Sequence, residues 1–543
     1  TEEIIGNVED IVELAVKELL GISAEVELDE NCALSDLGLD SFLNIELSNL
    51  LSKHLQINVS ATICYDYPSI RMIKNHLSNL FVPEKQIKSS SNYSRHEIIV
   101  SGMSCRFGDG WNEEGLWKIF SEGRDMIGLI PRNRWRWEEV YDSDRMKEGK
   151  SVSKWGCFFE GIEMFDASFF NISPREAKSM DPQQRMLLEV GWEMVENSGR
   201  EPEKLEEMKE EVGVYVGIQS SEYASRLEGE EAQFGASGNA LSTSAGRISY
   251  YFGITGVAMS IDTACSSSLV SIVYGVKSIE NGESGMSMCF GVNSVISKNA
   301  IIQLSRAGML SSDGRCKTFD NKANGYVRGE GCGGVLLEKM DEKEERRMVG
   351  KVRGYCINQD GRSNGLTAPN GPSQVRLIKE GMRKGGVEKE EISYLEAHGT
   401  GTSLGDPIEI GAIEESYGRG RKNNLVIGTA KTNVGHCETA AGIVGVMKAL
   451  MSMEKGKMTK HLHLENLNSY IGVEKMEKMK SVIPNEEIEW KEEEEEEKRI
   501  VGVSSFGFSG TNCHIILEGR MRKEEGRNQD TCLFEFSKEG DIG

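Results

Sequence analysis

One cysteine stands among small residues at a junction between a predicted strand and a predicted helix. Residues 262–269 read DTACSSSL, with Cys265 at the centre. The apolar run before it, residues 256–261, predicts a buried strand, and the apolar spacing of residues 270–276 predicts a buried helix. Free backbone N–H groups and the positive end of a helix dipole would stabilise a thiolate at such a junction. Cys265 is therefore a candidate nucleophile, although free cysteines are also often buried for structural reasons.

Two histidines lie in glycine-rich segments far downstream of this cysteine. His398 belongs to EAHGTGTSLGDP at residues 396–407, and His436 belongs to KTNVGHCE at residues 431–438. An apolar helix is predicted directly after the second motif, over residues 439–453. Both histidines are expected in loops after strands, beside glycines that let backbone and substrate approach closely. They are candidates for proton transfer or hydrogen bonding to a substrate.

A serine opens a predicted helix near the start of the chain. Residues 37–47 read LGLDSFLNIEL, in which Ser41 follows an acidic residue. The apolar face of this helix is expected to comprise Phe42, Ile45 and Leu47. Apolar spacing over residues 8–20 predicts another helix, and no strand pattern interrupts residues 1–80, which favours a small helical bundle. The structural alternative for Ser41 is a simple helix N-cap.

The composition limits the class of protein. The chain has 543 residues, enough for two to four domains, and a net charge of −23, which argues against a nucleic-acid partner. Twelve cysteines without a C-x-x-C pair favour a reducing, cytoplasmic environment and no metal site. No apolar run is long enough for a membrane span and no signal peptide opens the chain. Because it begins at Thr1, we expect a fragment of a longer polypeptide.

The pattern of elements divides the chain into four parts. After the helical unit 1–80 comes a polar linker at residues 81–95. Strand-like and helical segments then alternate over residues 96–518, which predicts an α/β fold with largely buried sheets, and residues 519–543 form a polar tail. The expected strands are 97–103, 212–218, 257–261, 286–292, 334–337, 425–429, 500–503 and 514–517. Three charge runs are expected to be solvated, at residues 203–211, 341–347 and 492–497.

One glycine pattern invites a dinucleotide-binding interpretation. Residues 329–334 read GEGCGG and satisfy G-x-G-x-x-G. A dinucleotide site requires this pattern to follow a strand and open a helix, whereas here it leads into the predicted strand 334–337. No nicotinamide site is expected.

Residues 1–80 resemble an acyl carrier protein. The resemblance rests on the segment around Ser41, although Phe42 stands where leucine is usual in that family. It implies that Ser41 carries a covalent 4′-phosphopantetheine arm. An arm of this kind has to be attached at an exposed helix start, which is where Ser41 is expected.

Residues 96–518 resemble a β-ketoacyl synthase of the kind found in modular polyketide synthases and animal-type fatty acid synthases. Besides the cysteine and histidine motifs, the matching stretches are MDPQQR at 180–185, GYVRGEG at 325–331, NQDG at 358–361 and FGFSGTN at 506–512. The resemblance implies a thiolase-type fold of five αβαβα layers made from two similar halves. Cys265 would lie in the first half and both histidines in the second.

The same resemblance implies roles in chain elongation. Cys265 would accept the growing acyl chain, with the backbone N–H groups of Cys265 and Phe508 holding the oxyanion. A malonyl-type extender would then lose carbon dioxide, and His398 and His436 would hydrogen-bond the enolate oxygen. Lys431 would organise the histidine pair.

Further implications concern the carrier and partners. Thr400 and Thr402 match threonines that hydrogen-bond the pantetheine arm, and a phosphopantetheinyl transferase would attach the arm to Ser41. A carrier ahead of a synthase resembles the boundary between two modules. The pattern G-x-S-x-G occurs at residues 361–365 (GRSNG) and 401–405 (GTSLG), but both matches overlap synthase motifs and neither indicates an acyltransferase, so extender loading would come from elsewhere on the parent chain or from a separate protein. A homodimer through the synthase domain is expected.

Two alternatives stay open at this point. The chain is also compatible with an elongating unit of an iterative synthase of the fatty-acid type. A catalytically silent acyl-relay or scaffold module is the alternative from another class, and the presence of both histidines argues against it.

Overall fold

A computed structural model describes residues 2–39, 41–57, 59–79, 97–207, 211–340, 347–490 and 498–519. The expected linker 81–95 and the charge run 492–497 lie outside these residues. The tail 519–543 also lies outside the described residues except for Gly519, and the charge run 341–347 lies outside them except for Arg347. The boundaries proposed for these segments therefore stay predictions.

The N-terminal unit is entirely helical in its described residues. It contains α1 (Glu2–Leu20), α2 (Ser41–Leu55), α3 (Ile63–Asp66) and α4 (Ile70–Asn79). Its core is formed by aliphatic side chains from the helices and from the loops that connect them: Val8, Val12, Ala15, Val16, Leu34, Leu39, Leu47, Leu51, Val59, Ile63, Ile70, Ile73 and Leu77. The small helical bundle predicted from the sequence is confirmed.

The expected apolar face of α2 is partly wrong. Leu47 is buried, as predicted, and Leu51 joins it in the core, but Ile45 is only half-buried and lies outside the core cluster. In α1, Leu14 is 53% exposed although it fits the apolar spacing. A short bundle has too little interior to cover every apolar position of its helices.

The remaining described residues build one long sheet of eleven strands. The strand order is β12-β10-β9-β14-β15-β8-β1-β7-β6-β4-β5. The strands are β1 (Ile98–Phe107), β4 (Val212–Gly217), β5 (Ala258–Ile261), β6 (Met286–Asn293), β7 (Gly331–Lys339), β8 (Gly350–Gln359), β9 (Ile392–Glu396), β10 (Leu425–Gly428), β12 (Ser481–Val482), β14 (Arg499–Phe506) and β15 (Thr511–Gly519). Strands β1 and β8 pair only at Ile98–Val100, so this narrow junction joins two halves of similar size.

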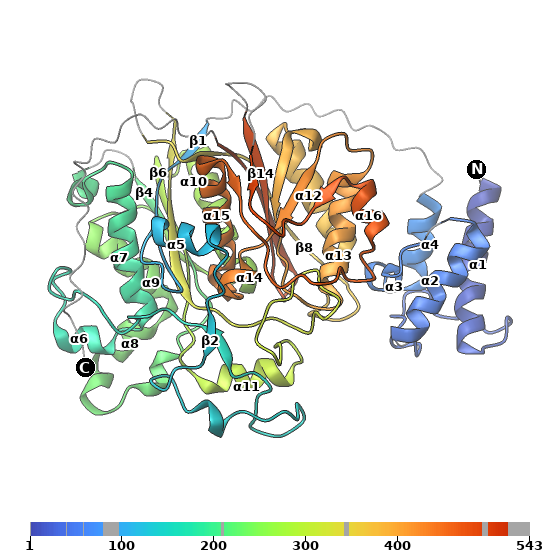
Figure 1. Ribbon diagram of the computed structural model, residues 1–543, viewed down its shortest axis with the longest axis horizontal. Helices are drawn as coiled ribbons and strands as arrows, with labels where there is room; N and C mark the ends of the chain where they lie inside the picture. The colour runs from blue at the N-terminus through green and yellow to red at the C-terminus, as the bar shows by residue number, and fades with distance from the viewer. Residues whose placement is uncertain are drawn as a thin grey trace.

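Helices cover both halves and fill the space between them. The two central helices, α10 (Ser267–Glu280) and α15 (Ala441–Lys455), are buried along most of their length (Figure 1). Helices α7 (Pro182–Asn197) and α9 (Leu241–Phe252) cover the first half from outside, and α12 (Gly371–Gly385) and α13 (Gly405–Ile413) cover the second. This is the predicted arrangement of five αβαβα layers made from two halves.

The shorter elements lie around these layers. They are α5 (Glu113–Ser121), α6 (Pro174–Ser179), α8 (Gly235–Asn239), α11 (Lys298–Arg306), α14 (Lys431–Val434), α16 (Val473–Lys478), β2 (Ile127–Leu129), β3 (Trp155–Cys157), β11 (Lys457–Met458) and β13 (Ile488–Glu489). No helix in the described part of the chain combines the length and apolarity needed to cross a membrane.

Each of the eight predicted strands coincides with an observed one, but the burial predicted for β5 is wrong. The side chains of β5 are exposed or half-buried, and Met259 is 37% exposed. The reason is topological, since β5 is the last strand of the sheet and pairs on one side only, with β4. Strands β8 and β9 were not predicted. The glycine pattern at 329–334 does lead into β7, as expected.

Candidate active site

The turn that carries Cys265 is held in an unusual backbone conformation. It follows the end of β5 as a single 3-10 turn, Ala264–Ser266, before α10 begins. Ala264 has a φ of 55°, a backbone angle that residues other than glycine rarely adopt. Its N–H donates to Asp262 Oδ1 at 2.9 Å, and its carbonyl accepts from Ser267 Oγ at 2.6 Å. The small polar neighbours of the cysteine therefore fix its turn, which is the kind of strain that proteins keep at functional sites.

The two central helices meet at their N-terminal ends because Gly442 has no side chain. A Cβ on Gly442 would lie 2.6 Å from Leu269 Cγ of α10. At the same crossing the N–H of Ile443 donates to Ser268 Oγ at 2.9 Å. The close approach places the Cys265 turn beside the segment that carries His436.

The structure brings the three predicted side chains together from three loops. Cys265 Sγ and one ring nitrogen from each of His398 and His436 all lie within 4.8 Å of one another. The two imidazole rings are 5.6 Å apart between centroids and nearly perpendicular, at 85°. His398 follows β9, and His436 lies between α14 and α15. One face of a small substrate group can therefore reach the sulfur and both rings.

Hydrogen bonding fixes which nitrogen of His436 carries the proton. The backbone N–H of Glu438 donates to His436 Nδ1 at 2.9 Å, so in the neutral ring Nε2 holds the hydrogen. Arg328 anchors the Glu438 carboxylate with two bonds of 2.7 and 2.8 Å, and both residues are largely enclosed. Nε2–H is thus available as a donor to substrate.

His398 is positioned through its backbone. The N–H groups of His398 and Gly399 donate to the two carboxylate oxygens of Glu409 at 2.7 and 2.8 Å. Within the described residues His398 Nδ1 is buried without a hydrogen-bond partner. A buried polar atom of this kind is costly unless something pairs with it, which fits a site that a polar substrate completes.

Burial sets the protonation states of the three groups. It lowers the pKa of His398 and of His436 well below the usual value, and the positive charge of Lys431 adds to the effect. Burial also raises the pKa of the Cys265 thiol to about 11. The expectation of a resting thiolate is therefore wrong, since desolvation outweighs the stabilisation by the junction.

The backbone N–H groups predicted as oxyanion donors act on the Cys265 sulfur. The N–H groups of Phe508 and of Cys265 itself approach the sulfur and lower its pKa, although less than burial raises it. The Phe508 turn is tied to the nucleophile by Ser505 Oγ, which donates to the Cys265 carbonyl at 2.6 Å. These N–H groups can hold an oxygen on a carbon bonded to the sulfur.

The lowered pKa values of His398 and His436 predict how the rate of condensation on acylated Cys265 depends on pH. Both imidazoles gain a proton only well below pH 6.5, so they stay neutral at pH 6.5 to 8. We expect condensation by enzyme already acylated on Cys265 to proceed at a constant rate between pH 8 and about 6.5. Single-turnover rates across this range check it. A titration centred at or above pH 6.5 would contradict the neutral pair.

The remaining predicted residues line the surroundings of this cluster. Lys431 is buried at the start of α14, and its charge acts on both histidines and on Cys265. Thr400 and Thr402 are half-buried, with their hydroxyl oxygens 3.4 Å apart. They follow His398 directly, so hydroxyls that can bind a polar arm lie next to the cluster.

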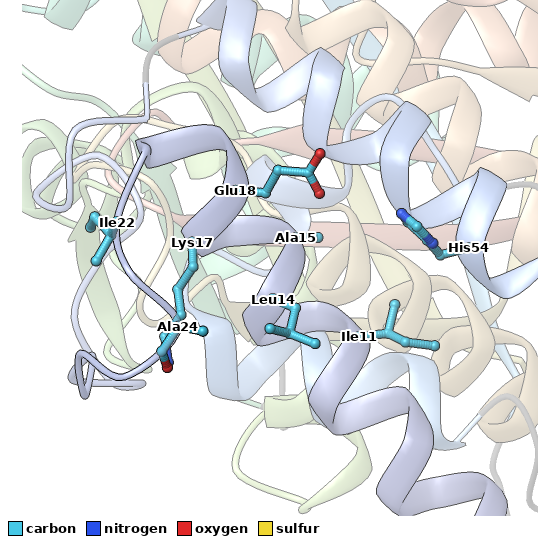
Figure 2. A pocket seen from close by; sticks show the side chains of 8 residues that line it. All are labelled: Ile11, Leu14, Ala15, Lys17, Glu18, Ile22, Ala24 and His54. Atoms are coloured by element: carbon cyan, nitrogen blue, oxygen red, sulfur yellow. The ribbon is translucent and has the colours of Figure 1, made fainter.

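Ser41 is the first residue of α2, so the predicted helix start is confirmed, while its side chain lies outside the described residues. A cavity of about 410 Å³ lies in the same bundle, lined by Ile11, Leu14, Ala15, Lys17, Glu18, Ile22, Ala24 and His54 (Figure 2). His54 is near the opposite end of α2 from Ser41. The cavity therefore belongs to the far end of the bundle.

Comparison with known families defines the class of this protein. Family models match at residues 10–77 (phosphopantetheine attachment site), 95–343 (β-ketoacyl synthase, N-terminal domain), 349–465 (β-ketoacyl synthase, C-terminal domain) and 472–539 (ketoacyl-synthetase C-terminal extension). The chain belongs to the β-ketoacyl synthase family. It is an enzyme of the acyltransferase class, with a carrier domain that matches the phosphopantetheine attachment model ahead of the synthase.

Its relatives are modular polyketide synthases. Erythronolide synthase EryA2 of Saccharopolyspora erythraea is 36% identical over 98% of this chain, and polyketide synthase PksN of Bacillus subtilis is 34% identical over 97%. The chain spans only 15% and 10% of these two proteins. Among solved structures, the oxazolomycin ketosynthase domain OzmH KS7 of Streptomyces albus is 32% identical, with a TM-score of 0.75. That match covers 80% of this chain and 76% of the other.

Proposed function

We propose that Cys265 accepts an acyl chain from a carrier-bound thioester. The sulfur attacks the thioester carbonyl, the N–H groups of Cys265 and Phe508 hold the oxygen, and the donor thiol departs. Because the pKa of the Cys265 thiol is about 11, a base has to accept its proton during attack. The neutral imidazole of His398 supports that role, because His436 already holds a hydrogen on Nε2 and accepts the Glu438 N–H at Nδ1, and the departing sulfur finally takes the proton.

The second step is the decarboxylative condensation of a malonyl-type extender. Its carbon–carboxylate bond breaks, carbon dioxide leaves, and the electron pair gives an enolate whose oxygen is hydrogen-bonded by His398 and His436. The enolate carbon then attacks the acyl carbonyl on Cys265. A carbon–carbon bond forms, the bond to sulfur breaks, and the departing Cys265 thiolate takes a proton from solvent to restore the thiol. Burial keeps both rings neutral, the charge of Lys431 adds to this effect, and the same charge supplies positive potential for the developing negative charge.

The observation that carries this proposal is the convergence of one sulfur and two imidazoles within 4.8 Å, with two N–H groups at the sulfur. The test is to supply an acyl thioester and a malonyl-loaded carrier. A β-ketoacyl thioester and carbon dioxide should appear in equal amounts. Carbon dioxide without a longer acyl chain would contradict the proposal.

We propose that Ser41 is the attachment residue of the arm and that Thr400 and Thr402 bind the arm near the site. When attached, the arm supplies a thiol that carries acyl groups as thioesters. Two features support this: Ser41 begins α2, and the phosphopantetheine model covers it.

This proposal predicts a single modification. A phosphopantetheinyl transferase with coenzyme A should add one arm to the unmodified protein, and Ser41→Ala should block the addition completely. Ser35→Ala, in the preceding loop, serves as the matched control and should be modified normally. Intact-protein mass spectrometry measures both. An unmodified wild-type protein beside a converted reference carrier would assign residues 1–80 to docking instead.

The exposed edge of the sheet supports a homodimer through the synthase domain. Strand β5 leaves one edge unpaired, and Val257, Met259 and Tyr250 expose apolar surface there or on the neighbouring α9. An uncovered edge of this kind readily pairs with another chain. Because β5 leads directly into the Cys265 turn, a partner on this edge would also brace the nucleophile. A monomer in light scattering would exclude this arrangement.

The wider setting follows from the relatives. We propose that the carrier ends one module and hands its chain to the synthase that opens the next, within a longer cytoplasmic polyketide synthase. An acyltransferase elsewhere on that chain or on a separate protein would load the extender. All eleven cysteines in the described residues are free thiols, which suits a reducing compartment. Product length would separate this modular use from iterative elongation of the fatty-acid type.

A further inference from the structure

The carrier domain lies against the second half of the synthase, beside α12, α13 and α16 (Figure 1). One contact joins Asp66, the last residue of α3, to Gly371, the first residue of α12. A Cβ on Gly371 would lie 2.5 Å from Asp66 Oδ1 and 3.2 Å from Asp66 Cγ. The absence of a side chain at this position is therefore what admits the carrier. An acidic side chain at the start of a long helix also faces the positive end of the helix dipole.

Both domains enclose the Asp66 carboxylate. Oδ2 accepts a hydrogen bond from Thr62 Oγ1 of the carrier at 2.8 Å. Oδ1 is buried without a well-aligned partner, but the N–H of Gly371 and the charge of Lys475 on α16 both act on the carboxyl. Burial raises its pKa to about 6 against these influences. Groups from two synthase elements thus surround one carrier side chain.

A second part of the contact lies next to Asp66. Tyr67 stacks on His76 of α4, with ring centroids 4.0 Å apart. Arg376 of α12 and Glu415 of the π-helical turn Glu414–Gly418 act on Tyr67, and Glu415 also acts on His76. Charged groups of the synthase therefore lie near enough to Tyr67 and His76 to act on them, beside the Asp66 contact.

This docking surface is connected to the mouth of the active site. The first turn of α12 is tied to the end of β8, because Asn358 Nδ2 donates to the Ser373 carbonyl at 2.8 Å and Ser373 Oγ donates to the Gln359 carbonyl at 3.0 Å. The next residue, Asp360, donates its N–H to the Gly510 carbonyl at 2.9 Å. Gly510 belongs to the turn that carries Phe508. The carrier therefore docks at the same end of the sheet as the oxyanion turn.

The docked face of the carrier is also the face from which its arm would start. Cys64 of α3 donates its S–H to the Asn44 carbonyl of α2 at 3.6 Å. Ser41 precedes Asn44 by three residues on α2, a rise of about 4.5 Å along the helix axis. The helix end that begins with Ser41 thus lies beside docked α3. The cavity in Figure 2, near His54, lies at the other end of α2.

We propose that the carrier delivers its acyl chain to Cys265 of its own chain while docked through Asp66 on the start of α12. This inference rests on the proposed function and adds the delivery surface to it. In the step itself, the acyl–sulfur bond on the carrier breaks, a new bond forms to Cys265 Sγ, and the Cys265 proton passes to the departing sulfur. Gly371 is the position on the synthase that permits this pose.

Gly371→Ala tests the pose directly, because the added methyl group meets Asp66 and otherwise makes only an ordinary contact with Ile408. The arm on Ser41 is loaded with an acyl group, and its single-turnover transfer to Cys265 is followed by mass spectrometry of peptides. We expect transfer to slow about tenfold or more, because overpacking opposes the docking through which the tethered carrier reaches the site at high local concentration. Loading of Cys265 from a small acyl thioester should be unchanged.

Two further variants make the result specific. Asp66→Ala combined with Gly371→Ala removes the clashing atoms, so the double variant should transfer faster than Gly371→Ala alone. Gly411→Ala, at a position with no atom within 4 Å of an added Cβ, is the matched control and should behave as wild type.

The possible outcomes distinguish a failure of the docking surface from a failure of the proposed function. If Gly371→Ala transfers as fast as wild type, or if the double variant is no faster than Gly371→Ala, delivery does not use this surface, while the proposed function stands. If wild-type Cys265 accepts no acyl group even from a small thioester, the proposed function is wrong and the delivery inference with it.

Discussion

Replacing Cys265 by alanine should abolish acylation of the synthase domain. The three-group cluster contains one sulfur atom, that of Cys265, and the N–H groups of Cys265 and Phe508 can hold an oxyanion beside it. Wild-type protein incubated with an acyl thioester should gain one acyl group on a peptide containing Cys265, measured by mass spectrometry. In Cys265→Ala the modified peptide should be missing at every time point, because covalent catalysis has no residual route without its nucleophile.

Two controls define that result. Cys32→Ala removes a half-buried thiol in the carrier domain and should leave acylation of the synthase unchanged. Cys265→Ser retains a weaker nucleophile and should acylate slowly, if at all. Equal acylation of residues 97–519 in Cys265→Ala and wild type would assign the nucleophile to another residue.

Replacing either histidine by alanine should slow condensation even when Cys265 has been acylated beforehand. In His398→Ala or His436→Ala, an enzyme acylated beforehand on Cys265 lacks one preorganised donor to the enolate oxygen. Loss of such a donor typically costs about a hundredfold to a thousandfold in rate. We therefore expect the acyl group to stay on Cys265 while carbon–carbon bond formation slows by about that factor, measured in single-turnover reactions with a malonyl-loaded carrier.

A conservative substitution at His436 tests its hydrogen-bonding role more specifically. His436→Gln keeps a side chain that donates a hydrogen bond and should lose less rate than His436→Ala. His54→Ala, in the exposed last turn of α2, is the matched control and should condense normally. Near-normal condensation in His398→Ala or His436→Ala would remove that histidine from the mechanism.

The main features of the fold and the site were predictable because they depend on local sequence. A cysteine between an apolar strand and an apolar helix, and histidines among glycines, identify loops at the ends of buried elements. The eight strongly apolar strands were recognised for the same reason. Strands β8 and β9 were missed because polar and charged residues interrupt their apolar pattern, as at Lys351 and Arg353 of β8.

Features that depend on contacts distant in sequence were not predictable. Arg328 and Glu438 are 110 positions apart, yet together they fix the tautomer of His436. Glu409 holds the His398 loop from a helix whose sequence reads simply as apolar. The protonation state of Cys265 depends on how completely the second half covers the first, which no local pattern reports. The exposure of β5 likewise follows from its place at the edge of the sheet.

The measurement that tests the central claim most directly is a single turnover with the acyl group already on Cys265. Labelled malonyl-loaded carrier is added, and carbon dioxide, the β-ketoacyl product and free Cys265 are quantified together. The account predicts that all three appear in equal amounts at one rate, and that His398→Ala slows all three equally. Transfer of the unchanged acyl group from Cys265 to another thiol, without release of carbon dioxide, would show a relay module and contradict the account.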